Sequence, residues 1–162
     1  MDIVKAFFSA PFFEWWSFEN GTYTGILESL KYIEQYSKEH GPFEGVLGFS
    51  QGACLAAILC ATHSRYPELS PLPGLRFGVL FSGFAPVDAS YSELFLEKIQ
   101  FPVYVSFGRT DFKKDDSIQL ADHFLDAVVI EHASDHQLPR KSTGAQAISS
   151  LHDFLGKQKQ QE

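Results

Sequence analysis

The sequence predicts an α/β fold in which a mostly parallel sheet carries helices on both of its faces. Strand-like and helix-like segments alternate along the chain, as they do in proteins built from strand–helix–strand units. Most of the strand-like segments are continuous apolar runs, which are typical of strands buried on both faces. The 162 residues contain no internal repeat or linker, so we expect one domain over residues 1–162 with a polar tail at 156–162.

Five segments are predicted as strands. Residues 3–8 form a short apolar run before an aromatic, turn-rich connection, and residues 44–49 follow a Gly-Pro pair. The other three are apolar runs rich in valine, isoleucine or phenylalanine, which favour buried strands. These three strands are residues 76–84, 101–108 and 127–132.

Five further segments are predicted as helices. In residues 24–40 apolar side chains recur at helical spacing, and Gly41-Pro42 ends the pattern. Residues 51–64 form an alanine-rich apolar run. Two carboxylates precede residues 117–125, where they suit the positive end of a helix dipole. The remaining two helices are residues 91–99 and 145–155.

The charge balance, the apolar runs and the cysteines indicate which partners and which cellular location to expect. With 20 acidic and 13 basic residues the formal net charge is −7, so we expect neither a nucleic-acid nor an anionic-membrane partner. No apolar run approaches the ~20 residues that span a bilayer, and the N-terminus lacks the basic region of a signal peptide. Cys54 and Cys60 provide no disulfide framework. We therefore expect a cytoplasmic protein without a membrane span.

The junction between the second predicted strand and its helix reads Gly48-Phe49-Ser50-Gln51-Gly52. A serine between two glycines at a strand-to-helix turn is typical of the nucleophile of α/β-hydrolases, because a sharp turn needs small neighbours and exposes the hydroxyl. The helix that begins at Gln51 directs its free N–H groups and positive end at the reacting oxygen. A glycine-rich turn without chemistry is the alternative interpretation.

Two further candidates also follow apolar strands. Ser50, Asp111 and His136 occur in the order Ser, Asp, His, and parallel strands bring their carboxyl ends to one edge of the sheet. A serine hydroxyl is a weak nucleophile until an imidazole takes its proton and a carboxylate orients that imidazole. We therefore expect the Ser50 hydroxyl to approach the His136 ring, and Asp111 to approach the far side of that ring.

Other residues compete for these roles. His132 lies four positions from His136 but still belongs to the predicted strand, whereas His136 lies in the loop beyond it. Asp115 and Asp116 fit a helix start better than a strand end. His132 and His136 also have the spacing of some metal ligands, but they lie on a strand and a loop instead of a helix, so we expect no metal and no cofactor.

Four blocks of the sequence resemble the FSH-type serine hydrolases, a family within the α/β-hydrolase superfamily. The resemblance covers about residues 10–155. The blocks are GPFEGVLGFSQGA at 41–53, FSGF at 81–84, GRTD at 108–111 and SDHQLP at 134–139. In place of the family's usual residues the chain has Glu44 for an aspartate and Ser134-Asp135 for two glycines.

The resemblance implies a cofactor-free hydrolase of carboxylic esters or thioesters. Carried over to this sequence, it makes Ser50 the nucleophile, Asp111 the orienting acid, His136 the base and the Gln51 N–H an oxyanion donor. We expect small to medium acyl chains, bound in a partly exposed pocket lined by aromatic residues beside Ser50. A catalytically weak or inactive relative that binds acyl ligands or a protein is the alternative.

The start of the sequence differs from the family pattern, because the opening strand and the oxyanion turn that follows it are not found. We therefore expect a truncated α/β-hydrolase fold whose activity is lower than that of longer relatives. The strand at residues 44–49 would then have an open edge, which is costly if buried and adhesive if exposed. Either residues 3–8 pair with it, giving a monomer, or a second copy covers it, giving a homodimer.

Overall fold

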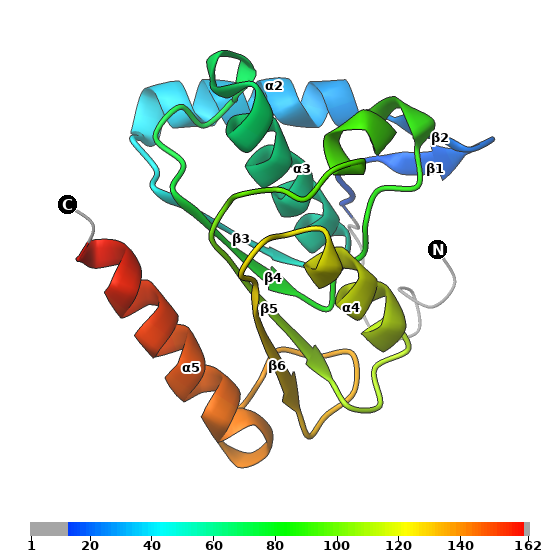
Figure 1. Cartoon of the computed structure of the whole chain (residues 1–162). Helices are drawn as coiled ribbons and strands as arrows, with labels where there is room; N and C mark the ends of the chain where they lie inside the picture. The colour runs from blue at the N-terminus through cyan, green and yellow to red at the C-terminus, as the bar shows by residue number, and fades with distance from the viewer. Residues whose placement is uncertain (1–12, 161–162) are drawn as a thin grey trace.

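The computed structural model describes residues 13–160 and has an α/β architecture around a four-stranded parallel sheet (Figure 1). The strands lie in the order β3-β4-β5-β6, and all three pairings are parallel. Their bounds are Gly45–Phe49, Phe77–Phe81, Val103–Gly108 and Val128–His132. The sheet therefore follows chain order, and the four predicted strands within the described residues are all present. The strand predicted at residues 3–8 lies outside them.

Helices cover both faces of the sheet, as the apolar strands predict. The helices α2 (Ile26–His40), α3 (Gln51–Arg65) and α4 (Lys114–Asp122) lie on one side, and α5 (Lys141–Lys159) lies on the other (Figure 1). The main core is on the α3 side, where residues 53–61 of α3 are all buried. These residues are mostly small, so the helix can approach the sheet closely. A smaller core joins Tyr104 on β5 to Phe154 on α5.

A short antiparallel hairpin replaces part of the connection that the sequence predicts as irregular. Its strands are β1 (Ser17–Glu19) and β2 (Thr22–Thr24), joined by Asn20-Gly21. Both turn residues have positive φ, which is the geometry that Asn-Gly turns favour in hairpins. Tyr23 is buried in the main core, and its side chain anchors the hairpin to the rest of the fold.

Several helices differ from their predicted limits. The segment predicted as a helix at 91–99 is the 3₁₀ helix η2 (Ala89–Phe95), and a second 3₁₀ helix, η1 (Pro67–Leu69), follows α3. α4 begins three residues earlier than predicted. α5 runs on to Lys159, through most of the predicted polar tail, because Gln158 is buried and its carbonyl accepts a hydrogen bond from Arg76 at 2.9 Å.

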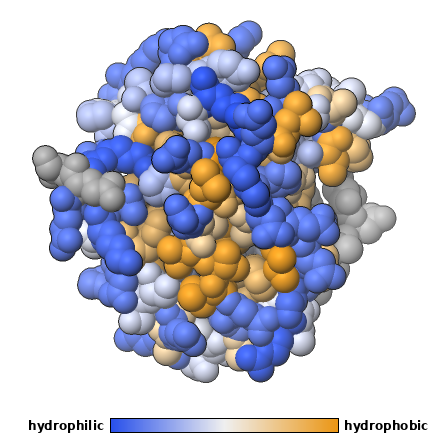
Figure 2. Space-filling model, viewed as in Figure 1, coloured by the Kyte–Doolittle hydropathy of each residue, from blue (hydrophilic) through white to orange (hydrophobic). Residues whose placement is uncertain are grey.

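β3 lies at one edge of the sheet. Within residues 13–160 no strand pairs with its outer side, so the predicted pairing with residues 3–8 falls outside the described part of the chain. Leu47 on this strand is 62% exposed. An apolar groove of about 460 Å³ runs between β3 and α5. Figure 2 shows apolar side chains gathered in the middle of one face of the molecule, with hydrophilic side chains around them.

Candidate active site

Ser50 lies in a strained turn between β3 and α3. Its φ of 54° and ψ of −116° are uncommon for a residue with a side chain, and its N–H donates to the carbonyl of Phe81 at 2.9 Å. The turn is tight because a Cβ atom on Gly48 would lie 2.1 Å from the carbonyl oxygen of Gly52. The glycine at position 48 is therefore required by the close approach of α3 to the end of β3.

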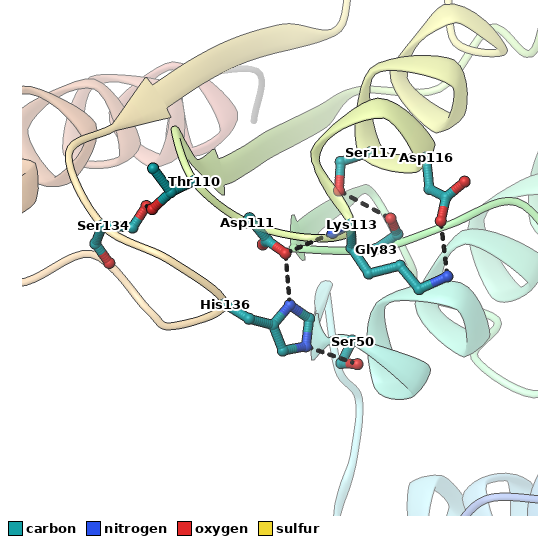
Figure 3. Close-up of polar contacts among 9 residues, drawn as sticks. All are labelled: Ser50, Gly83, Thr110, Asp111, Lys113, Asp116, Ser117, Ser134 and His136. Carbon is teal, nitrogen blue, oxygen red and sulfur yellow. Dashed lines mark hydrogen bonds and ion pairs between the residues drawn. The ribbon is translucent and has the colours of Figure 1, made fainter. Parts of the chain in front are cut away.

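The structure brings together the three residues that the sequence singles out (Figure 3). The Nε2 atom of His136 lies 3.1 Å from the Ser50 hydroxyl oxygen, and its Nδ1 atom lies 2.9 Å from Oδ1 of Asp111. Ser50 comes from the β3–α3 turn, Asp111 from the loop after β5, and His136 from the loop after β6. Side chains from three strand ends thus form one hydrogen-bonded row.

The loops that carry Asp111 and His136 are held against each other by their backbones. The N–H of Arg109 donates to the carbonyl of His132 at 2.8 Å, and the N–H of Thr110 donates to the carbonyl of Ser134 at 3.1 Å. A Cβ atom on Gly108 would lie 2.2 Å from the carbonyl oxygen of Asp135, so this approach also depends on a glycine. The separation of Asp111 and His136 is fixed by main-chain contacts.

The carboxylate of Asp111 stays charged although its side chain is fully buried. Burial raises its pKa, but the neighbouring Ser82 hydroxyl, the Lys113 N–H and His136 together lower it by more, so the pKa lies below its ordinary value. The Lys113 N–H donates to Oδ1 at 2.7 Å. A charged carboxylate at this position favours the His136 tautomer that carries its proton on Nδ1, which leaves Nε2 free to accept the proton of Ser50.

Two phenylalanines flank the imidazole of His136. The ring centroid of Phe49 lies 4.8 Å from that of His136, and the centroid of Phe112 lies 4.5 Å away. Phe112 is 70% exposed, so it forms an apolar rim at the mouth of the site. These rings limit the rotation of the imidazole and exclude part of the water around it.

The competing residues take other positions. His132 is buried at the end of β6, and neither of its ring nitrogens has a hydrogen-bond partner among the described residues. Burial lowers its pKa, which keeps the ring neutral. Asp116 forms an ion pair with Lys113 at 2.7 Å, and Asp115 is exposed in the first turn of α4. None of these three residues contacts Ser50.

Gln51 contributes both its backbone N–H and its side chain at this site. The sequence indicates the role of the N–H and not that of the side chain. It is the first residue of α3, and within residues 13–160 its backbone N–H has no hydrogen-bond acceptor. Its side chain, which the sequence does not single out, holds the segment at Trp15 and Trp16, just before the hairpin. Oε1 accepts the N–H of Trp15 and Nε2 donates to the carbonyl of Trp16, both at 2.8 Å. Trp15 and Trp16 lie 36 and 35 positions before Gln51, and no local sequence pattern indicates contacts over such a separation.

The aromatic residues before the hairpin divide between the core and the site. Trp16 is buried in the main core, whereas Trp15 and Phe49 line an apolar pocket of about 300 Å³ beside Gly52. Trp15 and Phe49 are the aromatic rings of this pocket, whose other lining residues are mostly aliphatic, and Trp16 serves the fold instead. That aromatic residues bind an acyl chain beside Ser50 stays a prediction.

The described residues contain no group of three histidine, cysteine, aspartate or glutamate side chains that could hold a metal ion. Cys54 and Cys60 are buried free thiols, and burial raises the pKa of Cys54 to about 12. Across residues 13–160 no helix has the length and apolar character to cross a membrane.

Comparison with known proteins shows the family of the chain. Residues 3–148 match the family described as "Serine hydrolase (FSH1)". The chain belongs to this family. Esterase OVCA2 from Homo sapiens is 39% identical over 132 residues, which cover 80% of this chain and 57% of that protein. Esterase CG5412 from Drosophila melanogaster is 35% identical over 124 residues, covering 75% of this chain and 43% of that protein. The chain thus spans about half the length of these relatives.

Solved structures with the same fold are more distant in sequence. The chain superposes on Zea mays acyl-protein thioesterase 2 with a TM-score of 0.60 and 17% identity, covering 89% of this chain and 71% of the other. Esterase PE8 gives a TM-score of 0.57 and 18% identity, covering 90% and 70%. At this level of identity the likeness concerns the α/β-hydrolase fold alone.

Proposed function

We propose that the FSH1-family chain is a serine hydrolase that cleaves carboxylic esters or thioesters of small to medium acyl chains. In this proposal Ser50 is the nucleophile, His136 the general base and Asp111 the acid that orients it. The observation that carries the proposal is the continuous row of hydrogen bonds from Asp111 through His136 to Ser50. Its support is that each residue has the chemistry, and the position at a strand end, that acyl transfer requires.

The first half of the reaction forms an acyl-enzyme. The Ser50 oxygen attacks the acyl carbon while His136 Nε2 takes the hydroxyl proton, and the carbonyl oxygen gains the negative charge. Asp111 stabilises the imidazolium that forms. The tetrahedral intermediate then collapses, and the bond to the leaving alcohol or thiol breaks as Nε2 returns the proton to that group.

The second half releases the acid. Water takes the place of the leaving group and attacks the acyl carbon, with its proton passing to His136 Nε2. The bond to Ser50 breaks as the proton returns to the serine oxygen, and the free carboxylic acid departs. The chain consumes one water for each ester or thioester, and the proposed reaction needs no cofactor.

The backbone N–H of Gln51 is the proposed donor to the oxyanion. It lies at the positive end of α3, next to the nucleophile, and has no acceptor within residues 13–160. Loss of one oxyanion donor costs ~10²–10³ in kcat in a well-studied serine protease. Activity should therefore depend strongly on how many further donors reach the same oxygen.

The substrate class follows from the surroundings of Ser50. The apolar pocket beside Gly52 and the exposed ring of Phe112 suit a hydrocarbon acyl chain more than a charged one. Relatives named as esterases support an ester, and a structural neighbour that is an acyl-protein thioesterase makes a thioester the second substrate to test.

Hydrolysis of p-nitrophenyl esters of increasing acyl length tests the proposal. We expect the rate to rise from acetate to a medium chain, and we expect Ser50→Ala and His136→Ala to lose nearly all of it. His152→Ala is the matched control, because its side chain is 89% exposed on α5. Folded wild-type protein that hydrolyses none of these esters or the matching thioesters would contradict the proposal and favour a binding module.

A further inference from the structure

Asp111 has one carboxylate oxygen that the hydrogen-bonded row does not use. Oδ1 accepts from both His136 and the Lys113 N–H, whereas Oδ2 is buried and has no hydrogen-bond partner among the described residues. A buried, charged oxygen without a donor is costly, so a donor is expected beside it.

Ser82 lies at the end of β4, next to β5, and is completely buried. Its N–H donates to the carbonyl of Ser106 at 2.9 Å, which fixes its backbone against β5. Its hydroxyl oxygen also has no hydrogen-bond partner within residues 13–160. Ser82 Oγ and Asp111 Oδ2 are thus two buried polar atoms without a partner, one just after β4 and the other after the adjacent strand β5. Ser82 is also the neighbour that lowers the pKa of Asp111 most, which agrees with a hydroxyl close to the carboxylate.

The backbone at Ser82 has a conformation that disfavours residues with a side chain, which indicates that the hydroxyl is retained for a specific contact. Its φ of 50° is in the left-handed region, where glycine is the least strained residue. Glycine stands instead at the next position, Gly83, where a Cβ atom would lie 2.8 Å from Ala53 and 2.9 Å from Leu120. The strained position thus holds a residue with a hydroxyl, although the backbone alone favours one without a side chain.

We propose that Ser82 is a positioning residue for Asp111, whose Oδ2 accepts the Ser82 hydroxyl proton while Oδ1 faces His136. With both oxygens held, the carboxylate cannot rotate away from the imidazole. This inference deepens the proposed function and rests on it for its consequence in catalysis. The hydrogen bond itself is a structural claim and can be tested without activity.

The test compares Ser82→Ala and Ser82→Gly with the control Ser106→Ala. Ser106 is an equally buried serine whose hydroxyl also lacks a partner among the described residues, but it interacts with Tyr104 and not with Asp111. Ser82→Ala removes the hydroxyl but keeps the Cβ atom, and with it the backbone strain at positive φ. Ser82→Gly removes both, so it should have a higher thermal midpoint than Ser82→Ala.

The primary measurement is the proton NMR resonance of the His136 Nδ1–H, which the hydrogen bond to Asp111 shifts downfield. We expect both Ser82 variants to move this resonance upfield and to speed its exchange with water, while Ser106→Ala leaves it unchanged. On a p-nitrophenyl ester, kcat should fall about tenfold in both Ser82 variants with little change in KM, as loss of one hydrogen bond to a charged group allows.

An unchanged His136 resonance in the two Ser82 variants would overturn the proposal. So would an equal change in Ser106→Ala, since that would indicate general loosening of the core. If His132→Gln moves the resonance and the Ser82 variants do not, the buried His132 supplies the donor and Ser82 does not. A wild-type chain without esterase activity would refute the proposed function, and the resonance would still decide the role of Ser82.

Discussion

Asp88 and Asp111 are both buried, and hydrogen-bond donors keep both charged. The N–H groups of Ser90 and Tyr23 donate to Asp88 at 2.8 and 2.7 Å and lower its pKa, with the Ser90 contact having the larger effect. The Lys113 N–H and His136 donate hydrogen bonds to Asp111 and lower its pKa in the same way. Asp88 contacts only residues of the fold, whereas Asp111 contacts the candidate base His136, although the local chemistry of the two carboxylates is alike.

Asp111→Asn tests the orienting role. The amide keeps the shape of the side chain but removes its charge, so it no longer favours the required tautomer of His136 or stabilises the imidazolium. We expect kcat to fall by about 10²–10⁴ with a small change in KM. Asp116→Asn, which alters an ion pair with Lys113 near the site, should change kcat by less than about threefold. Equal losses in the two variants would contradict the assignment.

Asp88→Asn tests the pH dependence of stability. Because the folded pKa of Asp88 lies below its unfolded value, its contribution is present above about pH 4 and is lost as the pH falls through the folded pKa. Wild type should exceed the variant in free energy of unfolding at pH 7, and the difference should shrink steadily below pH 4. Denaturant unfolding at several pH values measures it, and a constant difference would show that Asp88 is not charged in the fold.

At the scale of elements, the end of β3 and the start of α3 approach each other closely at Gly48. Gly48 faces the backbone of Gly52 and Ala53, which cannot move aside as a flexible side chain can. The position of Ser50 depends on this contact, because it sets the direction in which α3 leaves the sheet.

Gly48→Ala should therefore destabilise the protein by more than about 3 kcal/mol, or prevent folding, because the new Cβ would meet backbone atoms. Gly156→Ala is the matched control, since its Cβ would meet nothing within 4 Å and it lies inside α5. It should stabilise the chain by about 0.5–1 kcal/mol. Thermal and denaturant unfolding compare the two, and a Gly48→Ala protein as stable as wild type would refute the packing argument.

The elements also indicate what the sequence could predict. The strands β3 to β6 are recognisable because apolar runs of this length, bounded by turn residues, favour strands of a covered parallel sheet. The hairpin was missed because strands of three residues carry little pattern, although Asn20-Gly21 is a hairpin turn. The proximity of Ser50, Asp111 and His136 could be predicted because each follows a strand. Their catalytic roles stay a prediction. The side chain of Gln51 and the hydroxyl of Ser82 depend on contacts between distant segments, which no local pattern specifies.

At the scale of the whole molecule, the outer edge of β3, which has no neighbouring strand among the described residues, is the feature with the clearest consequence. Its backbone groups have no strand partner within residues 13–160, and Leu47 presents an exposed apolar side chain beside them. Such an edge is a template for pairing with another chain. The same strand ends at Phe49, the residue before Ser50, so any partner on this edge would lie near the candidate site.

Leu47→Lys should reduce association between copies of the chain, because a charge on an edge strand opposes pairing. Sedimentation across a range of concentrations should show a mass that rises for wild type and rises less for the variant. Leu69→Lys is the control, since Leu69 is 68% exposed on η1 and is not part of the edge. A mass that is constant for wild type, or an equal change in the control, would contradict this prediction.

The most direct test of the central claim, that Ser50 is an activated nucleophile, is reaction with a fluorophosphonate probe followed by mass spectrometry. We predict one adduct per chain, located by peptide mapping on Ser50. The adduct should be absent in Ser50→Ala and retained in Ser92→Ala, a variant of an exposed serine on η2. A folded wild-type chain that gains no adduct, or a Ser50→Ala chain that still gains one, would contradict the account.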